Sequence, residues 1–509
     1  MPKFVSTRAV SRIRTLVRRA PVRSGARPRA VSALFALALC PGLSGCILGS
    51  ERPELNLDVP AAYRAGPKGA AADRAVPAVD WWRGFRSSEL TVLMDAAQVY
   101  NFDIAVAIAQ VIQADAQVGV SGAALLPTIS GNASAEREHT SGGSSGALGG
   151  NVVSSGGTNL SIYSTGLTAS YILDFWGKNR ATLAASEESA TASRYNREVV
   201  TLTTMATVAN TYFTILAAQD QLRVTRQNLA AAERILNLIK TQFAGGTASQ
   251  LDVSQQEALV ATQRAAIPPL EVTRDQNIAA LAVLVGRAPA NFSVRGGSTS
   301  AIAVPRVTPG LPSELLYQRP DIRQAEATLA ASNFSVEAAR AAFFPQIQLT
   351  GTTGLQSTAL ASLFTPGAWF YTMTASLTQP IFDGFLLESQ LKQAKGVQLQ
   401  DLQSYRKAVI SAFSDVEKAL IGLHNFTLQE RLQQDVVAAS RKAFEVAETQ
   451  LRGGTVNLIT VLQAEQTLFT AENNLVTVRL NKLLAASSLF QALGGGWTPQ
   501  GTLATASLE

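Results

Sequence analysis

Four side chains in the sequence have the chemistry of nucleophiles or soft metal ligands, namely Cys40, Cys46, His139 and His424. The two histidines lie far apart in the chain, and neither has a second metal ligand or a nucleophile at a catalytic spacing. The sequence also lacks a glycine-rich phosphate-binding loop. We therefore expect no catalytic residue, metal or dissociable cofactor, and we interpret the protein as one that is not an enzyme.

Cys46 has a neighbourhood suited to covalent modification. It follows Leu43-Ser44-Gly45, an apolar run over 31–39, and nine Lys or Arg without any acid in the first 45 residues. This order is typical of a signal peptide, and the small residues before the cysteine resemble the bacterial lipobox. The apolar run is shorter than the ~20 residues of a membrane-spanning helix. We therefore expect 1–45 to be a lipoprotein signal peptide and Cys46 to carry covalent lipid.

Removal of this leader reverses the sign of the net charge. Lys and Arg total 43 in the chain and nine lie in the leader, which leaves 34 against 37 acids. The basic pI is then a property of the leader and gives no reason to expect a nucleic acid partner. Cys40 leaves with the leader, so no thiol pair remains for a disulfide.

The rest of the chain is duplicated. Residues 241–257 and 449–465 agree at eight of 17 positions when they are aligned at a shift of 208. A second pair of matching segments, 123–129 and 341–347, has a shift of 218. The sequence thus predicts an N-terminal acylated segment over 46–88, two homologous repeats over 89–310 and 311–493, and a tail over 494–509.

Each repeat contains a segment that breaks the helical pattern and reads as a β-hairpin, over 127–177 and 345–384. In the second hairpin, apolar and hydroxyl-bearing residues alternate over about ten positions, which is the length of a membrane-spanning strand. Trp369 and Tyr371 are the expected membrane-interface anchors. The first hairpin alternates less cleanly, and its inward face is left open. The alternative is a pair of exposed hairpins in a soluble protein.

Each hairpin is followed by a long stretch with helical periodicity, 178–243 and 385–451. At a rise of ~1.5 Å per residue, each would extend ~100 Å. Paired glycines then permit a turn into a return helix, over 247–286 and 456–493. In the first return helix, Pro268-Pro269 should produce a kink or a break.

Four strands cannot close a barrel, and an open sheet edge cannot face lipid. The strands must therefore pair between copies of the chain, and a symmetric ring is the simplest arrangement. A hollow barrel that continues into coiled helices describes a duct across a membrane and the space below it. The fold class is thus an α+β membrane protein with a long coiled-coil barrel.

An ordered set of motifs carries a resemblance to a known family. The set comprises Trp81-Trp82 with Phe85, Leu311 to Glu326 with its Arg319-Pro320-Asp321, Ala338 to Pro345, Gln379 to Gly384, and Ala492 to Trp497. Over nearly all the mature chain, the sequence resembles the outer-membrane efflux proteins of tripartite pumps, and within them the acylated NodT-type members.

This resemblance implies a homotrimer with a twelve-stranded barrel in the outer membrane, lipid-anchored and extending into the periplasm. It implies a periplasmic end that opens when an adaptor protein and an inner-membrane proton-driven pump of the RND type engage it. The helical turns at that end correspond to Gly245, Gly246, Thr247, Gly453, Gly454 and Thr455. The gate candidates are Val456 and Asn457, which stand where relatives often have an acid, and Asp252, which is the nearest carboxylate but lies in the other repeat. For Asp252, a first-turn acid favoured by the helix dipole is the alternative.

The expected function is a passive exit duct for small toxic compounds such as drugs or metals. Two alternatives remain open at the level of sequence. One is a type I duct for secreted proteins, and the other is a non-conducting coiled-coil scaffold lipoprotein.

Overall fold

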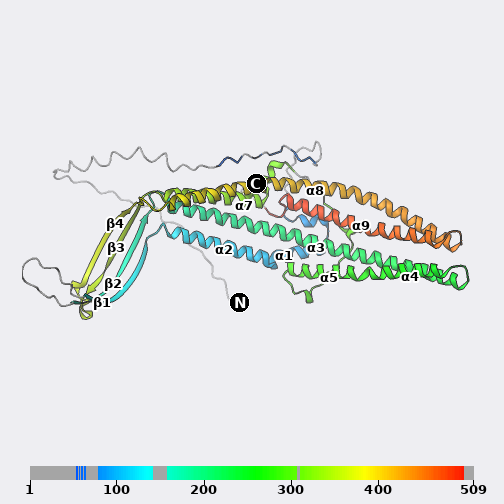
Figure 1. Cartoon of the computed structure of the whole chain (residues 1–509), viewed down its shortest axis with the longest axis horizontal. Helices are drawn as coiled ribbons and strands as arrows, with labels where there is room; N and C mark the ends of the chain where they lie inside the picture. The colour runs from blue at the N-terminus through cyan, green and yellow to red at the C-terminus, as the bar shows by residue number, and fades with distance from the viewer. Residues whose placement is uncertain are drawn as a thin grey trace, which may run out of the picture. The chain divides into compact units, whose positions relative to one another are not determined.

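The computed structural model describes residues 53–55, 57, 59–60, 62–64, 78–140, 158–305 and 310–497 (Figure 1). Cys46, the expected leader and the tail beyond 497 lie outside these ranges. Nine α-helices and four strands occur among the described residues, together with short 3-10 helices such as η1 (Trp81–Phe85). The elements of the first half are α1 (Ser88–Tyr100), α2 (Phe102–Ala123), β1 (Thr128–Thr140), β2 (Thr158–Leu173), α3 (Lys178–Ala244), α4 (Gln250–Ala265) and α5 (Ile267–Leu284). Those of the second half are α6 (Leu315–Gln318), α7 (Pro320–Ala341), β3 (Gln346–Ser357), β4 (Trp369–Thr378), α8 (Leu386–Arg452) and α9 (Leu458–Ala492).

The two halves have the same order of elements. In each, a helix of 22 residues (α2 or α7) leads into a hairpin, and the hairpin leads into a helix of 67 residues (α3 or α8). A helix of this length extends ~100 Å. The sheet therefore lies at one end of α3 and α8, and the turns into α4 and α9 lie at the other end (Figure 1).

The return helices differ between the halves. The single helix that the sequence suggests over 247–286 is divided into α4 and α5, with the break at Ala266. Pro268 and Pro269 occupy the first turn of α5, where the missing N–H costs nothing. The second return helix, α9, has no proline and runs unbroken for 35 residues.

The four strands form one antiparallel sheet in the order β1-β2-β3-β4. Directly opposed residues of neighbouring strands point to the same face, so the register assigns each side chain to one of the two faces of the sheet. One face is apolar and the other is largely hydroxyl and amide. The apolar face carries Ile129, Tyr163, Leu167, Tyr171, Leu173, Ile347, Leu349, Leu355, Trp369, Tyr371, Met373 and Leu377. The polar face carries Ser130, Asn132, Ser134, Ser164, Thr168, Ser170, Gln348, Thr350, Thr352, Thr372, Thr374 and Ser376.

This register assigns the faces of the first hairpin, which the sequence left open. Ser134 and Ser164 share a hydrogen bond of 2.7 Å across β1 and β2, and Gln348 donates to Ser170 across β2 and β3. The alternation in β2 is weak because its Leu160, Ile162 and Ile172 lie on the same face as Ser164 and Ser170.

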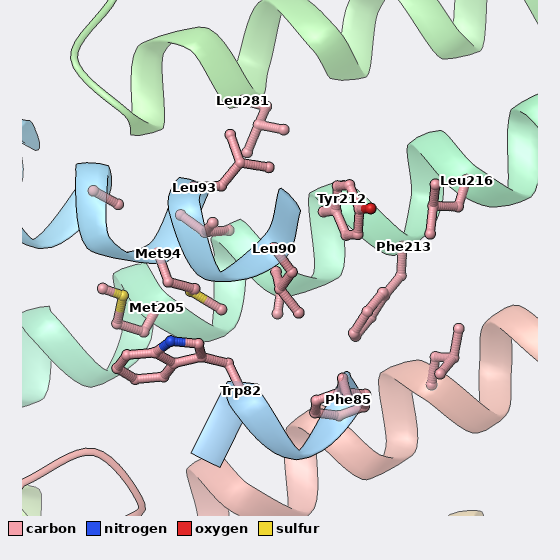
Figure 2. Packing of buried hydrophobic residues seen from close by; sticks show 14 of the residues in the cluster. Trp82, Phe85, Leu90, Leu93, Met94, Met205, Tyr212, Phe213, Leu216 and Leu281 are labelled. Atoms are coloured by element: carbon pink, nitrogen blue, oxygen red, sulfur yellow. The ribbon is translucent and has the colours of Figure 1, made fainter. Parts of the chain in front are cut away.

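A cluster of buried apolar side chains joins the two halves near the middle of α3, and we call it the central cluster (Figure 2). η1 supplies Trp82 and Phe85, α1 supplies Leu90 and Met94, and α3 supplies Phe213, all nearly inaccessible to solvent. From the second half, Phe490 of α9 stacks on Trp81 with ring centroids 5.1 Å apart. The segment before α1 is therefore part of the core.

A glycine closes one side of this cluster. Gly286 follows α5 with a φ of +68°, and a Cβ placed there would lie 2.2 Å from the carbonyl oxygen of Tyr100. Beside it, the Asn101 side chain donates to the Leu284 carbonyl and accepts from the first N–H groups of α2. The α1–α2 junction and the end of α5 thus approach each other backbone to backbone.

We expect Gly286→Ala to destabilise the protein by ~1–3 kcal/mol, because it combines a left-handed backbone with a clash. Thermal unfolding followed by circular dichroism would measure this. The control is Gly297→Ala, where a Cβ would meet nothing within 4 Å. Equal unfolding temperatures for the two variants would contradict the close approach at Tyr100.

Candidate functional sites at the two ends of the long helices

The first helical turn, after α3, is closed by its glycines. The N–H of Gly245 donates to Thr241, that of Gly246 to Phe243, and that of Thr247 to Gln242. Gly246 has a φ of +77°, and a Cβ there would meet nothing within 4 Å. The glycine is thus needed for its backbone conformation, and its outer side is open to a partner.

The second turn repeats this geometry and lies beside the first. Gly454 has a φ of +68°, and the N–H of Thr455 donates to Gln450 over 3.0 Å. The two turns are linked, since the Gln242 amide lies 3.5 Å from the Leu451 carbonyl. Beneath them is an apolar cluster that includes Ile239, Val253, Phe444, Leu451, Leu458 and Val461. The structure therefore brings all six predicted turn residues to one end of the molecule's helices.

The three gate candidates have local structural partners. Asp252 is half-buried and forms a capping box, because its carboxylate accepts from the N–H and the hydroxyl of Ser249 and its own N–H donates to that hydroxyl. These hydrogen bonds hold the pKa of Asp252 below its ordinary value. Asn457 caps α9 by accepting from the Thr460 N–H, and Val456 packs against the apolar cluster. Their role in gating stays a prediction.

A buried carboxyl group near the turns was not singled out from the sequence. Glu465 of α9 is fully buried, and Gln256 of α4 beside it is also inaccessible. The Gln256 amide donates to the Ala232 carbonyl over 3.0 Å and lies 3.5 Å from Glu465 Oε2. The remaining oxygens of both side chains have no hydrogen-bond partner among the described residues.

Burial sets the protonation of this group. It raises the pKa of Glu465 to about 7, with a smaller contribution in the same direction from Glu448, against the opposing effects of Gln256 and Arg234. Glu257 occupies the same position in the first repeat but pairs with Lys240 at the surface over 2.8 Å. The two copies therefore place the same residue in opposite environments.

At the other end of the helices, Trp369 and Tyr371 begin β4 on the apolar face of the sheet. Their side chains are 60% and 63% exposed, and their ring centroids are 5.4 Å apart. Exposed aromatic rings above Met373 and Leu377 are the pattern of a strand that meets a membrane interface. No group of three or more His, Cys, Asp or Glu that could hold a metal occurs in the described part of the chain.

The model of the family described as outer membrane efflux protein matches this chain twice, over 93–287 and 311–495. The chain belongs to the outer membrane efflux protein family. It is 35% identical over 459 residues to the pyoverdine export outer membrane protein OpmQ of Pseudomonas aeruginosa, covering 89% of this chain and 96% of that protein. It is 31% identical over 462 residues to the toluene efflux pump outer membrane protein TtgC of Pseudomonas putida, covering 90% and 94%.

Among solved structures, the open state of the Neisseria gonorrhoeae MtrE outer membrane channel matches this efflux protein with a TM-score of 0.75 and 29% identity. The match covers 88% of this chain and 97% of that one. The two family matches each enclose one hairpin and one 67-residue helix. This efflux protein is accordingly an outer-membrane channel.

The buried carboxyl makes stability depend on pH. An acid whose pKa rises on folding from 4.5 to about 7 binds protons more tightly in the folded state. The free-energy cost of burying the charged carboxylate is therefore absent below the pKa of the unfolded chain and fully present above the pKa of the folded protein. The free energy of unfolding should fall as the pH rises between these two pKa values.

We expect Glu465→Gln to remove this slope and to stabilise the protein at pH 8 by on the order of 2 kcal/mol. Unfolding temperatures at a series of pH values from 5 to 8 would show it. Glu257→Gln is the matched control, since it changes the same residue of the other repeat at the surface. An unchanged slope in Glu465→Gln would refute the assignment.

Proposed function

We propose that this protein is the trimeric outer-membrane channel of a tripartite efflux pump and serves as a passive exit duct for small toxic compounds. The observation that carries the proposal is a four-stranded sheet with two free edges, joined directly to two 67-residue helices. Three such sheets close into a barrel of twelve strands, and the helices below them continue the passage.

The sheet edges support association into a ring. In the single chain, β1 and β4 each pair on one side only, and unpaired backbone groups in a bilayer cost several kcal/mol each. Pairing β1 of one copy with β4 of the next satisfies both edges without any other element.

The outward surface of α1 and α2 supports the same association. Val92, Val99, Val106 and Ile112 are each more than half exposed in the single chain. The stretch Ser88–Ala123 is as long and as apolar as a membrane-spanning segment, although few of its residues are buried. An apolar helical face of this length fits a second copy of the chain, which would bury it in the assembled channel.

The helical turns are the proposed contacts for a periplasmic adaptor and the inner-membrane pump. Gly246 and Gly454 leave open space on their outer sides, which allows a partner's backbone to approach closely. The chain has no nucleotide-binding loop, so the energy for transport must come from that pump.

The proposed cargo is small molecules, because the similar proteins OpmQ and TtgC are named for pyoverdine export and toluene efflux. A protein-secretion duct and a non-conducting scaffold are the alternatives. Neither is favoured by an observation in this chain.

The full-length protein, purified in detergent, should migrate as a heat-resistant trimer and conduct ions in planar bilayers. A deletion strain should become more sensitive to small toxic compounds and should recover with the wild-type gene. A stable monomer without conductance would support the scaffold, whereas loss of one secreted protein without a change in sensitivity would support the secretion duct.

We further propose that Cys46 carries the lipid that tethers the channel. The segment after it is held on α8, where the Arg406 guanidinium donates to the carbonyl groups of Glu54 and Leu55 over 3.0 and 2.9 Å. Glu54 lies eight positions after Cys46, and eight steps of extended chain reach ~26–29 Å. Arg406 lies 20 residues into α8 from Leu386, a rise of ~30 Å from the sheet end. The tether is therefore long enough to approach the membrane.

Cys46→Ala should abolish incorporation of labelled fatty acid and should slow or misplace assembly. The trimers that do form should conduct like the wild type, because the barrel inserts through its own apolar face. Cys46→Ser would serve as a control for side-chain size. Label that persists in either variant would show that lipid is attached elsewhere.

A further inference from the structure

The loop end of β1 carries an alternating run of charges, Glu136-Arg137-Glu138-His139. The structure places His139 inside β1. These four are the only Asp, Glu, Lys, Arg or His in the four described strands.

Strand alternation sorts the four charges onto opposite faces. Arg137 lies opposite Ser161 and His139 opposite Asn159, on the apolar face of the sheet. Glu136 and Glu138 lie opposite Ile162 and Leu160, on the polar face. In a closed barrel the apolar face meets lipid and the polar face lines the lumen, so both bases point outward and both acids inward.

Register also gives the depth of the two bases. Tyr163 lies on the same apolar face, opposite Ala135, two residues farther from the long helices than the level of Trp369 and four residues farther than that of Tyr371. At ~3.3 Å per residue, Arg137 lies ~7 Å and His139 ~13 Å beyond Tyr163, on the side away from the long helices. If the helices occupy the periplasm, as the proposed function requires, both bases lie at the headgroups of the outer leaflet.

The surroundings of the two bases suit an anion. Arg137 forms no ion pair with any described residue, and its cross-strand neighbours are neutral. His139 Nδ1 lies 2.8 Å from the Asn159 side-chain oxygen, so the ring donates there and turns Nε2 away from this contact. A planar guanidinium offers paired donors that match the oxygens of a phosphate, and a histidine ring adds a third when both of its nitrogens are protonated.

We propose that Arg137 and His139 bind the phosphate groups of the phosphorylated glycolipid in the outer leaflet, with one such site on each copy of the chain. The proposal rests on the orientation given by the proposed function. The inward position of Glu136 and Glu138 serves the same end, because an acid on the outer face would repel that lipid.

Native mass spectrometry of the full-length trimer with bisphosphorylated lipid A would test this. Wild-type trimers should retain up to three lipids, and the double variant Arg137→Gln with His139→Gln should show at least a tenfold higher apparent Kd. The double variant Glu136→Gln with Glu138→Gln is the matched control, since it changes the same strand on the other face, and it should bind like the wild type.

Two further arms identify the ligand. Lipid A without phosphates should bind wild type no better than it binds the Arg137 and His139 variant, and inorganic phosphate at millimolar concentration should not displace lipid A. Displacement by inorganic phosphate would indicate a general anion site and overturn the lipid assignment, as would equal lipid A binding by wild type and variant. Bilayer conductance of the same trimers separates these outcomes from a failure of the channel itself.

If the double variant fails to form trimers, Arg137→Lys provides the test. It keeps the charge but loses the paired donors, and it should weaken lipid A binding less than Arg137→Gln does. Equal binding by these two variants would overturn the role of the guanidinium.

Discussion

The backbone hydrogen bonds of a sheet in lipid are the constraint on which the rest of this structure depends. β1 and β4 each leave one edge unpaired, and no water in the bilayer can satisfy those groups. The single chain is therefore an incomplete unit, and its exposed apolar surfaces on α1 and α2 are consistent with burial in an assembly. The side-chain pattern follows the same constraint, because a closed barrel must show lipid one face and water the other.

Periodicity and repeats were sufficient to predict most of the fold. The lengths of α3 and α8, the glycine turns and the break near Pro268 all follow from local rules of helix formation. The faces of the first hairpin could not be predicted in this way, because Leu160, Ile162 and Ile172 interrupt the alternation of polar and apolar residues. Only the pairing with β3, whose alternation is clear, assigns that hairpin, and pairing between distant segments is not a local property.

At the helical turns, the sequence likewise predicts local features but not those that depend on packing between distant segments. The positions of the turn residues were predictable, since a left-handed glycine at the end of a helix is a local signal. The environment of each acidic side chain near the turns could not be predicted in the same way. Asp252 satisfies its own helix end, while Glu465 is buried and its repeat counterpart Glu257 is exposed. An alignment of the two copies finds identity at 257 and 465, although packing has given the two carboxyl groups different environments.

The two glutamates lie on the return helices, which are the elements that differ most between the two halves. α4 is a short helix between a glycine turn and the break at Ala266, whereas α9 opposite it is continuous. Gln256 ties α4 to α3 through the Ala232 carbonyl and lies against Glu465 of α9. The raised pKa of Glu465 therefore depends on its burial beside Gln256, because a carboxyl group exposed to water would regain its ordinary acidity.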